Sequence, residues 1–130
     1  MELTAQQLFD DKKYRFNSQL EELQEAQREN KKEQGFIEQL QERFYRVQQQ
    51  EHKLYEHSLN EVDPEERPFF EERQDEGFHL SRKALQEFEE EQEQLAQDRK
   101  NLLEQEDSVR FDQRTFLKSE GKENLSGTKI

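Results

Sequence analysis

Cysteine and tryptophan are missing from the 130 residues, and only 4 glycines and 2 prolines occur. Without cysteine the chain has no disulfide framework and no thiolate chemistry. So few glycines and prolines argue against a flexible linker. No apolar run approaches the roughly 20 residues of a membrane-spanning helix. The first residues lack the basic start and apolar core of a signal peptide, so we expect neither a membrane span nor a leader.

Apolar residues are also scarce. They make up 28% of the chain, whereas charged residues make up 40%. A compact domain is usually close to half apolar, so a thick core is not expected. The residues that dominate (Glu, Gln, Leu, Lys, Arg and Ala) favour helices, and ten Phe and three Tyr argue against plain disorder. This composition predicts long helices that pack through narrow apolar seams.

The net charge of −12 is unevenly distributed. Residues 1–60 carry 12 acidic and 9 basic side chains, which gives −3, and residues 61–130 carry 20 and 11, which gives −9. Such a surface repels phosphates and anionic headgroups, so we expect no binding to nucleic acid or to membranes.

Two ladders of residues at seven-residue spacing mark the helix seams, because such a repeat faces another helix. The first ladder predicts a helix over about residues 4–60 with Thr4 as N-cap; it comprises Phe9, Phe16, Leu23, Asn30, Ile37 and Phe44, with Leu20 and Tyr55 at the alternate spacing. The second predicts a helix over about residues 64–117; it comprises Phe88, Leu95, Leu102, Val109 and Phe116, with Phe78 and Leu85 at the alternate spacing.

The segment between the ladders predicts a turn near residues 60–68. Asp63 can cap a new helix, Pro64 suits its first position, and Glu66 can complete a capping box. Pro68 would remove a hydrogen bond from the second turn, so either the helix restarts there or its first turn is irregular. Beyond Leu117 the chain is polar and contains Gly and Ser, and we predict that residues 118–130 are a disordered tail.

The two ladders mirror each other, and this relation predicts an all-α fold: a long antiparallel two-helix hairpin over residues 1–117. A fold at residues 62–63 places Phe9 near Phe116, Phe16 near Val109, Leu23 near Leu102 and Ile37 near Phe88. The layers of antiparallel coiled coils interleave, so a register shift of two or three residues stays open. Two such hairpins would give a four-helix bundle.

Further apolar residues flank the main seams: Leu40, Val47 and Leu54 on the first helix, and Ala96, Leu103 and Leu117 on the second. All of these except Ala96 are our candidates for partner binding. Either they widen the hairpin's own seam or helices of a partner cover them. The acidic second helix favours a partner stripe with basic flanks. Phe69 and Phe70 near the turn are also candidates for exposure to a partner.

Catalytic chemistry is not expected. His52 and His57 are five residues apart, so they point to different sides of a helix and do not form a metal site. No nucleophile has a base at a usable spacing, and no glycine-rich loop cradles a phosphate. We therefore predict a non-enzymatic protein without a cofactor or metal.

The residues around the turn resemble those of a known family. In a cysteine-free helical chain folded once, the runs Asp63-Pro64-Glu65-Glu66-Arg67 and Phe70-Glu71-Glu72-Arg73-Gln74-Asp75-Glu76-Gly77-Phe78 resemble the small LXG-associated helical proteins, which are targeting factors of Gram-positive type VIIb (ESX-like) secretion. The resemblance covers residues 5–117. It implies binding to the helical N-terminal domain of an LXG toxin, beside a second small helical factor, so that the toxin is targeted for export.

Two features bear on a comparison with the WXG-type secretion proteins. It lacks their Trp-X-Gly turn, which suits the motif-poor second kind of LXG accessory factor. Their export signal, an aromatic residue four positions before an acidic one, is matched by Phe116 and Glu120. The resemblance implies a cytoplasmic protein, with co-export as the open alternative.

Two other functions fit a helical hairpin. One is a stalk-like coiled coil of a type III or flagellar export apparatus, although such a stalk generally has more basic patches for its contact with an ATPase ring. The other is a structural homodimer with a four-helix bundle as its core. Co-purification distinguishes the three, because the bound protein is a toxin domain, an ATPase, or a second copy of the chain.

Overall fold

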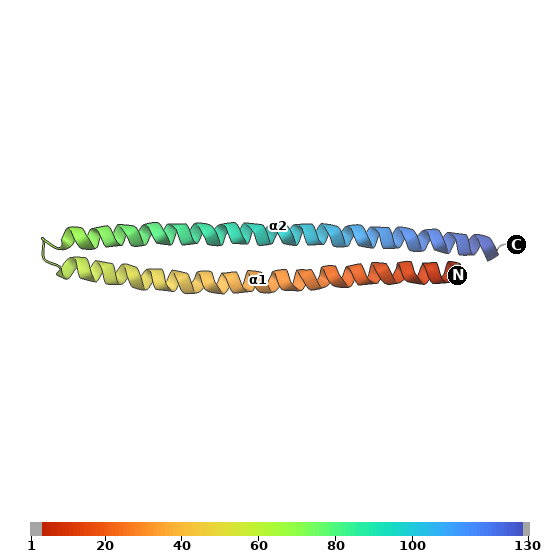
Figure 1. Cartoon of the computed structure of the whole chain (residues 1–130), viewed down its shortest axis with the longest axis horizontal. Helices are drawn as coiled ribbons and strands as arrows, with labels where there is room; N and C mark the ends of the chain where they lie inside the picture. Colours follow the sequence, from red (N-terminus) through yellow and green to blue (C-terminus); the bar gives the residue numbers. More distant parts are fainter. Residues whose placement is uncertain (1–3, 129–130) are drawn as a thin grey trace. The chain divides into compact units, whose positions relative to one another are not determined.

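The protein is a hairpin of two long helices. A computed structural model describes the backbone of residues 4–128 and the side chains of residues 4–120. Helix α1 spans Ala5–Glu61 and α2 spans Arg67–Thr128, with no strand among the described residues (Figure 1). The predicted all-α antiparallel hairpin is confirmed.

Thr4 caps the start of α1. Its Oγ1 accepts a hydrogen bond from the backbone N–H of Gln7 at 3.1 Å, and Gln7 Oε1 accepts one from the backbone N–H of Thr4 at 2.9 Å. This reciprocal pair is a capping box, which satisfies two donors that a helix start otherwise leaves without partners. The predicted N-cap is confirmed, and Gln7 completes it.

The chain reverses over residues 62–66. The carbonyl of Asp63 accepts hydrogen bonds from the N–H groups of Glu66 at 3.0 Å and Arg67 at 3.2 Å, so a tight turn leads directly into α2. Helix α2 begins at Arg67, which places Pro68 in its first turn. The missing N–H of proline costs nothing there, because the first N–H groups of a helix have no intrahelical acceptor.

Helix α2 continues past Leu117, where we expected it to end and a disordered tail to begin. It reaches Thr128, so residues 118–128 are helical, and residues 129–130 lie outside the described part. The segment contains no proline, and each added residue gains one backbone hydrogen bond on an existing helix. Gly121 and Gly127 each oppose this by about 1 kcal/mol relative to alanine, which weakens a helix without forbidding it.

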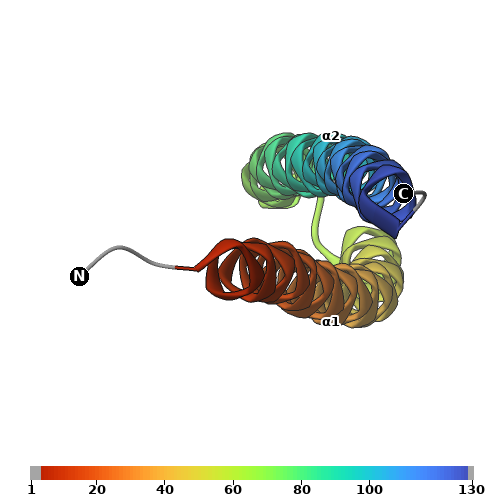
Figure 2. The ribbon, with the colours of Figure 1, turned by 90° about the vertical axis from the view of Figure 1, so that its right-hand side faces the viewer.

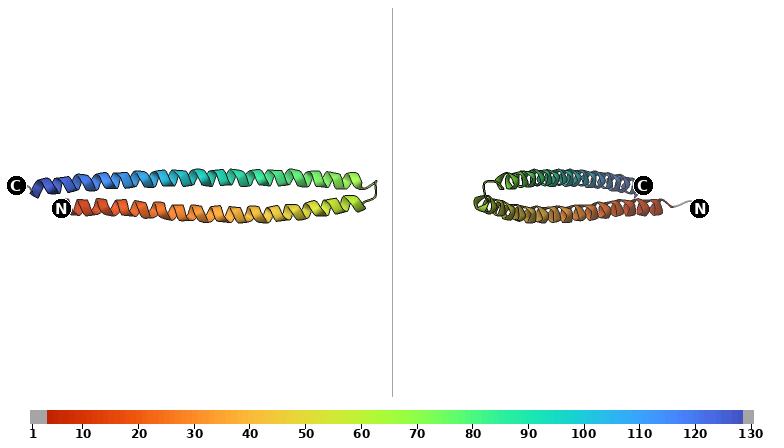
Figure 3. Two further views of the ribbon diagram at one scale, coloured as in Figure 1. Left: turned by 180° about the vertical axis from the view of Figure 1, so that it is seen from behind. Right: turned by 60° about the vertical axis from the view of Figure 1, so that its left-hand side comes forward.

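The hairpin divides into two units. In each of them a stretch of α1 lies beside a stretch of α2 (Figure 2, Figure 3). Unit 1 comprises Met1–Lys31 and Gln97–Ile130, and unit 2 comprises Lys32–Ala96. In unit 1 the ring of Phe116 lies 5.4 Å from that of Phe9 and 5.7 Å from that of Phe16, centroid to centroid. The predicted contact between Phe9 and Phe116 is confirmed.

The register in unit 2 differs from the expected one. Phe88 contacts Phe44, with ring centroids 5.7 Å apart, whereas we expected Ile37 opposite Phe88. The amide of Gln92 donates to Oε1 of Gln41 at 2.7 Å, which fixes the same register. The turn accounts for part of this difference: residues 62–66 centre on Pro64 rather than between residues 62 and 63, which moves the partner of Phe88 by about three of the seven residues from Ile37 to Phe44.

The core of the hairpin is narrow. Among the described side chains, the buried apolar ones are Leu20, 8% exposed in unit 1, and Leu95, 4% exposed in unit 2. Asn30 is buried with them at 7% exposure, on the same seven-residue ladder as Phe16 and Leu23. Two helices bury only one stripe each, so most large apolar side chains stay partly or fully exposed.

Gly35 offers a test of helix propensity. A Cβ at this position meets nothing within 4 Å, and no described glycine has a positive φ. We expect Gly35→Ala to raise the free energy of unfolding by about 0.5–1 kcal/mol, because alanine lowers the conformational entropy of the unfolded chain. Urea denaturation followed by circular dichroism measures the change.

Gly77→Ala is the matched control. A Cβ there lies 2.9 Å from Glu51 Oε1 and 3.3 Å from the Tyr55 hydroxyl, so these side chains have to move and the gain is offset. Equal stabilisation by both substitutions would contradict the close approach of the helices at Gly77.

Candidate partner-binding surface

The flanking ladder of α1 is exposed on unit 2. Val47 is 56% and Leu54 is 66% exposed, while Leu40 is half-buried. On α2, Leu103 is 44% and Leu117 is 38% exposed, and both belong to unit 1. Val47 and Leu54 therefore do not thicken the hairpin's own core, and the ladders of α1 and α2 form separate candidate surfaces.

Phe36 extends the α1 ladder, although its position in the sequence did not predict this. Its side chain is 61% exposed. Alternating steps of four and three residues connect it to the ladder, which is the spacing of a helix seam. We call this set the outer seam; it comprises Phe36, Leu40, Arg43, Val47, Gln50 and Leu54. The inner seam, which faces α2 within unit 2, comprises Ile37, Gln41, Phe44, Gln48, Glu51 and Tyr55, all half-buried.

Phe69 and Phe70 lie in the first turn of α2 and differ in exposure. Phe69 is 55% exposed, whereas Phe70 is half-buried. Their rings meet edge to face with centroids 5.6 Å apart, and the guanidinium of Arg73 lies 5.1 Å from the Phe69 centroid. Phe69 is therefore the more available of the two for a partner.

The two residues that match an export signal lie on the hairpin's own seam in unit 1. Phe116 is half-buried between Phe9 and Phe16, and Nζ of Lys12 lies 4.7 Å from the centre of its ring. Glu120 follows four residues later on α2 and is also half-buried. A receptor that binds the Phe116 ring would have to separate the ring from α1.

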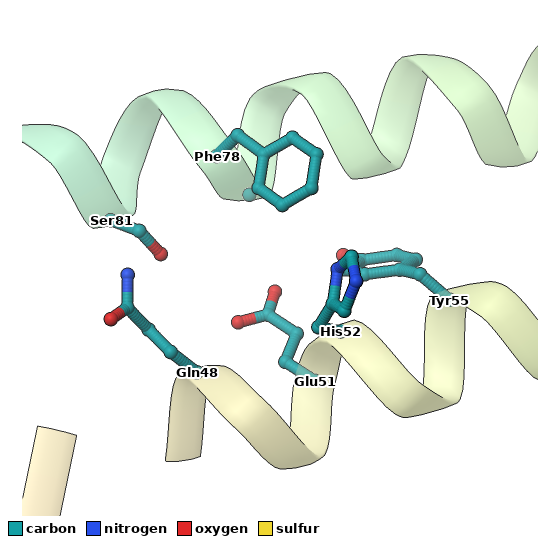
Figure 4. Close-up of a pocket in the computed structure, with 7 residues that line it drawn as sticks. Gln48, Glu51, His52, Tyr55, Phe78 and Ser81 are labelled. Atoms are coloured by element: carbon teal, nitrogen blue, oxygen red, sulfur yellow. The ribbon is translucent and has the colours of Figure 1, made fainter. Parts of the chain in front are cut away.

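A small cavity lies between the helices in unit 2 (Figure 4). Its lining includes Glu51, His52 and Tyr55 of α1 and Gly77 and Phe78 of α2, and its volume is about 30 Å³. That is room for about one water molecule and not for an organic substrate. Burial raises the pKa of the Tyr55 hydroxyl, and the charge and hydrogen bond of Glu51 raise it further.

Polar side chains also connect the helices in unit 1. The amide of Gln27 donates to Glu106, and Arg110 donates to the same carboxylate at 2.9 Å. These hydrogen bonds, that of Gln27 first, lower the pKa of Glu106. The amide of Gln113 donates to Oδ1 of Asn17 at 3.2 Å. Such pairs favour one register over its neighbours, because a slipped seam leaves them without partners.

Neither a metal centre nor a membrane span is visible in the described part of the chain. Over these residues, no three His, Asp or Glu side chains gather closely enough to hold a metal ion. The described helices also contain no stretch that is both long and apolar enough to cross a bilayer.

In comparisons with known proteins, the chain matches no family, no curated protein and no solved structure. The resemblance to LXG-associated factors therefore rests on the residues quoted for it. The exposed apolar seams are the features from which a function can be argued.

Proposed function

We propose that this chain is a non-enzymatic binding factor that packs the exposed seams of its hairpin against helices of another protein. The observation that carries the proposal is the outer seam, where Phe36, Val47 and Leu54 are each more than half exposed at heptad-compatible spacing. Exposed apolar side chains in a regular row mark interaction surfaces. Anchors at such spacing are typical of helix-to-helix recognition.

The partner we propose is the helical N-terminal domain of an LXG toxin, bound beside a second small helical factor. The support is the resemblance of residues 63–67 and 70–78 to LXG-associated factors, together with the two-helix hairpin. In this proposal the chain binds the toxin in the cytoplasm and targets it to the type VIIb secretion machinery, with co-export of the complex as the alternative.

The test is Val47→Glu, which places a charge in the middle of the outer seam. We expect the affinity for the purified toxin domain to fall by at least about 30-fold, or roughly 2 kcal/mol, as for the loss of an interface anchor. Helicity should be unchanged, because Val47 is 56% exposed. Isothermal titration calorimetry measures the binding, and circular dichroism measures the helicity.

Tyr45→Glu is the matched control, since Tyr45 is 57% exposed and lies two residues before Val47, which turns it to the other side of α1. It should bind the toxin domain like the unmodified chain. If Val47→Glu binds normally with its fold intact, the outer seam is not the interface. Loss of helicity would place Val47 in the hairpin's own core.

A further inference from the structure

The outer seam shares one face of unit 2 with part of α2. On one edge of the inner seam, His52 of α1 and Phe78 of α2 meet with ring centroids 6.0 Å apart (Figure 4). Leu54 and Leu80 each lie two residues further along, and two residues turn a helix by about 200°. Both leucines therefore lie on the opposite edge, about one helical turn apart in height, where they are 66% and 65% exposed. Leu80 thus belongs to the same face as the outer seam.

Leu80 lies in a row on α2 that has the spacing of the outer seam. Alternating steps of four and three residues connect the members of this row; they are Phe69, Arg73, Glu76, Leu80, Lys83 and Glu87. The apolar members are Phe69, which is 55% exposed, and Leu80, and both lie toward the turn. Arg73 and Glu76 between them form an ion pair with each other at 3.1 Å. Beyond Leu80, away from the turn, the row consists of charged side chains.

The apolar side chains of this face form a track that crosses from α1 to α2. On α1 the track runs from Phe36 to Leu54, and toward the turn the same row becomes polar at His57. On α2 the track begins at Leu80, close to the height of Leu54, and ends at Phe69. The two parts cover 18 residues of α1 and 11 of α2, or together about 40 Å at 1.5 Å per residue. We call this set the crossing track; it comprises Phe36, Leu40, Val47, Leu54, Leu80 and Phe69.

A second copy of the chain does not cover the whole track. Dimers are usually two-fold symmetric, and the axis can run along the helices or across them. With the axis along the helices, α1 of each copy lies on α2 of the other at the same height, so Val47 meets the charged Lys83 and Glu87. With the axis across the helices, the outer seam can pair with itself, but Leu80 then lies near the far end of the acidic residues 87–93. Each arrangement places part of the track over charged side chains, which is unfavourable.

We propose that the crossing track binds a single amphipathic helix of another protein, about 27 residues long at 1.5 Å per residue, which contacts α1 at one end and α2 at the other. Apolar anchors at steps of three and four residues are typical of helix-to-helix recognition. To pass from α1 to α2, about 8–10 Å apart, the helix crosses them at roughly 10–15°, close to a common packing angle. This inference rests on the proposed function and deepens it, because it adds Leu80 and Phe69 of α2 to the site and fixes the length of the partner's helix.

Leu80→Glu tests the α2 part of the track. We expect the affinity for the purified toxin domain to fall by at least about tenfold, as for the loss of an interface residue that contributes to binding. His79→Glu is the matched control, since His79 is exposed next to Leu80 and points about 100° away from it on α2. The control should bind like the unmodified chain. Isothermal titration calorimetry measures the binding, and a loss of helicity in Leu80→Glu would place Leu80 in the hairpin's own packing and overturn the inference.

Two synthetic peptides test the length of the helix without the toxin domain. One has four heptads and the other has two, with Leu at the first and fourth positions of each heptad and equal numbers of Glu and Lys elsewhere. Fluorescence anisotropy with nanomolar labelled peptide measures binding to the full chain. We expect the long peptide to bind at least about tenfold more tightly, because the short one spans only half of the track. Leu80→Glu and Val47→Glu should each weaken the long peptide, whereas His79→Glu should not.

The outcomes separate this inference from the proposed function. Toxin binding that is lost in Val47→Glu but unaffected in Leu80→Glu would confine the interface to α1 and overturn the inference alone. The expected peptide results without any toxin binding would overturn the proposed partner alone. Equal binding of the two peptides, no binding of the long one, or equal losses in Leu80→Glu and His79→Glu would overturn the inference. In sedimentation equilibrium of the chain alone, a dimer that Leu80→Glu dissociates would place a second copy on the track and overturn it as well, whereas a monomer agrees with it.

Discussion

Replacing Leu95 with alanine should destabilise the hairpin by about 2–5 kcal/mol, the range for a buried leucine truncated to alanine. Leu95 is 4% exposed and is the most deeply buried apolar side chain among the described residues. A narrow seam has few other contacts to compensate for the cavity. Since small domains are stable by only about 5–15 kcal/mol, a loss of this size is a large part of the total.

Leu80→Ala is the control for this prediction, because the same atoms are removed from a side chain that is 65% exposed. We expect a change within about 0.5 kcal/mol, as for ordinary surface substitutions. Urea denaturation followed by circular dichroism compares the two variants. Similar losses would mean that Leu95 does not lie in the seam.

The sequence predicted the hairpin and its two helices because both ladders keep one spacing over many turns. Local residue chemistry predicted the Thr4 cap and the position of the turn. The mirror relation between the ladders predicted the contact between Phe9 and Phe116. The sequence did not predict the register of Phe88, because it depends on where the turn is centred and on how the layers of the two helices interleave. A shift of the centre by one or two residues moves the partner of a seam residue by two to four residues, whereas Phe44 lies seven residues from Ile37.

Phe36 shows why part of the candidate surface could not be predicted. It precedes Ile37, and successive residues of a helix point about 100° apart. One of two adjacent apolar residues faces the partner helix, but their order along the chain does not say which. In the structure Ile37 is half-buried and Phe36 is 61% exposed, so Phe36 joins the outer seam.

Truncation of Phe116 should have the second large effect, at the open end of the hairpin. Its ring packs against both Phe9 and Phe16 and lies beneath Lys12. Truncating a core Phe to Ala costs about 3–5 kcal/mol, and the partial exposure of Phe116 places it near the lower end of that range. We expect faster hydrogen exchange at residues 9–16 in Phe116→Ala, because α1 loses its main contact there.

Phe111→Ala is the control on the same helix, since Phe111 is 63% exposed. The hydrogen-exchange pattern of Phe111→Ala should match that of the unmodified chain.

Phe116→Leu then separates the packing role of Phe116 from a role in export. Leucine keeps an apolar side chain in the seam but removes the aromatic ring that the export signal requires. If the chain is exported and Phe116 with Glu120 is its signal, Phe116→Leu should keep the exchange protection and lose export. If the Phe116 variants lose export only to the extent that they lose hydrogen-exchange protection, Phe116 acts in the packing of the seam and not as a signal.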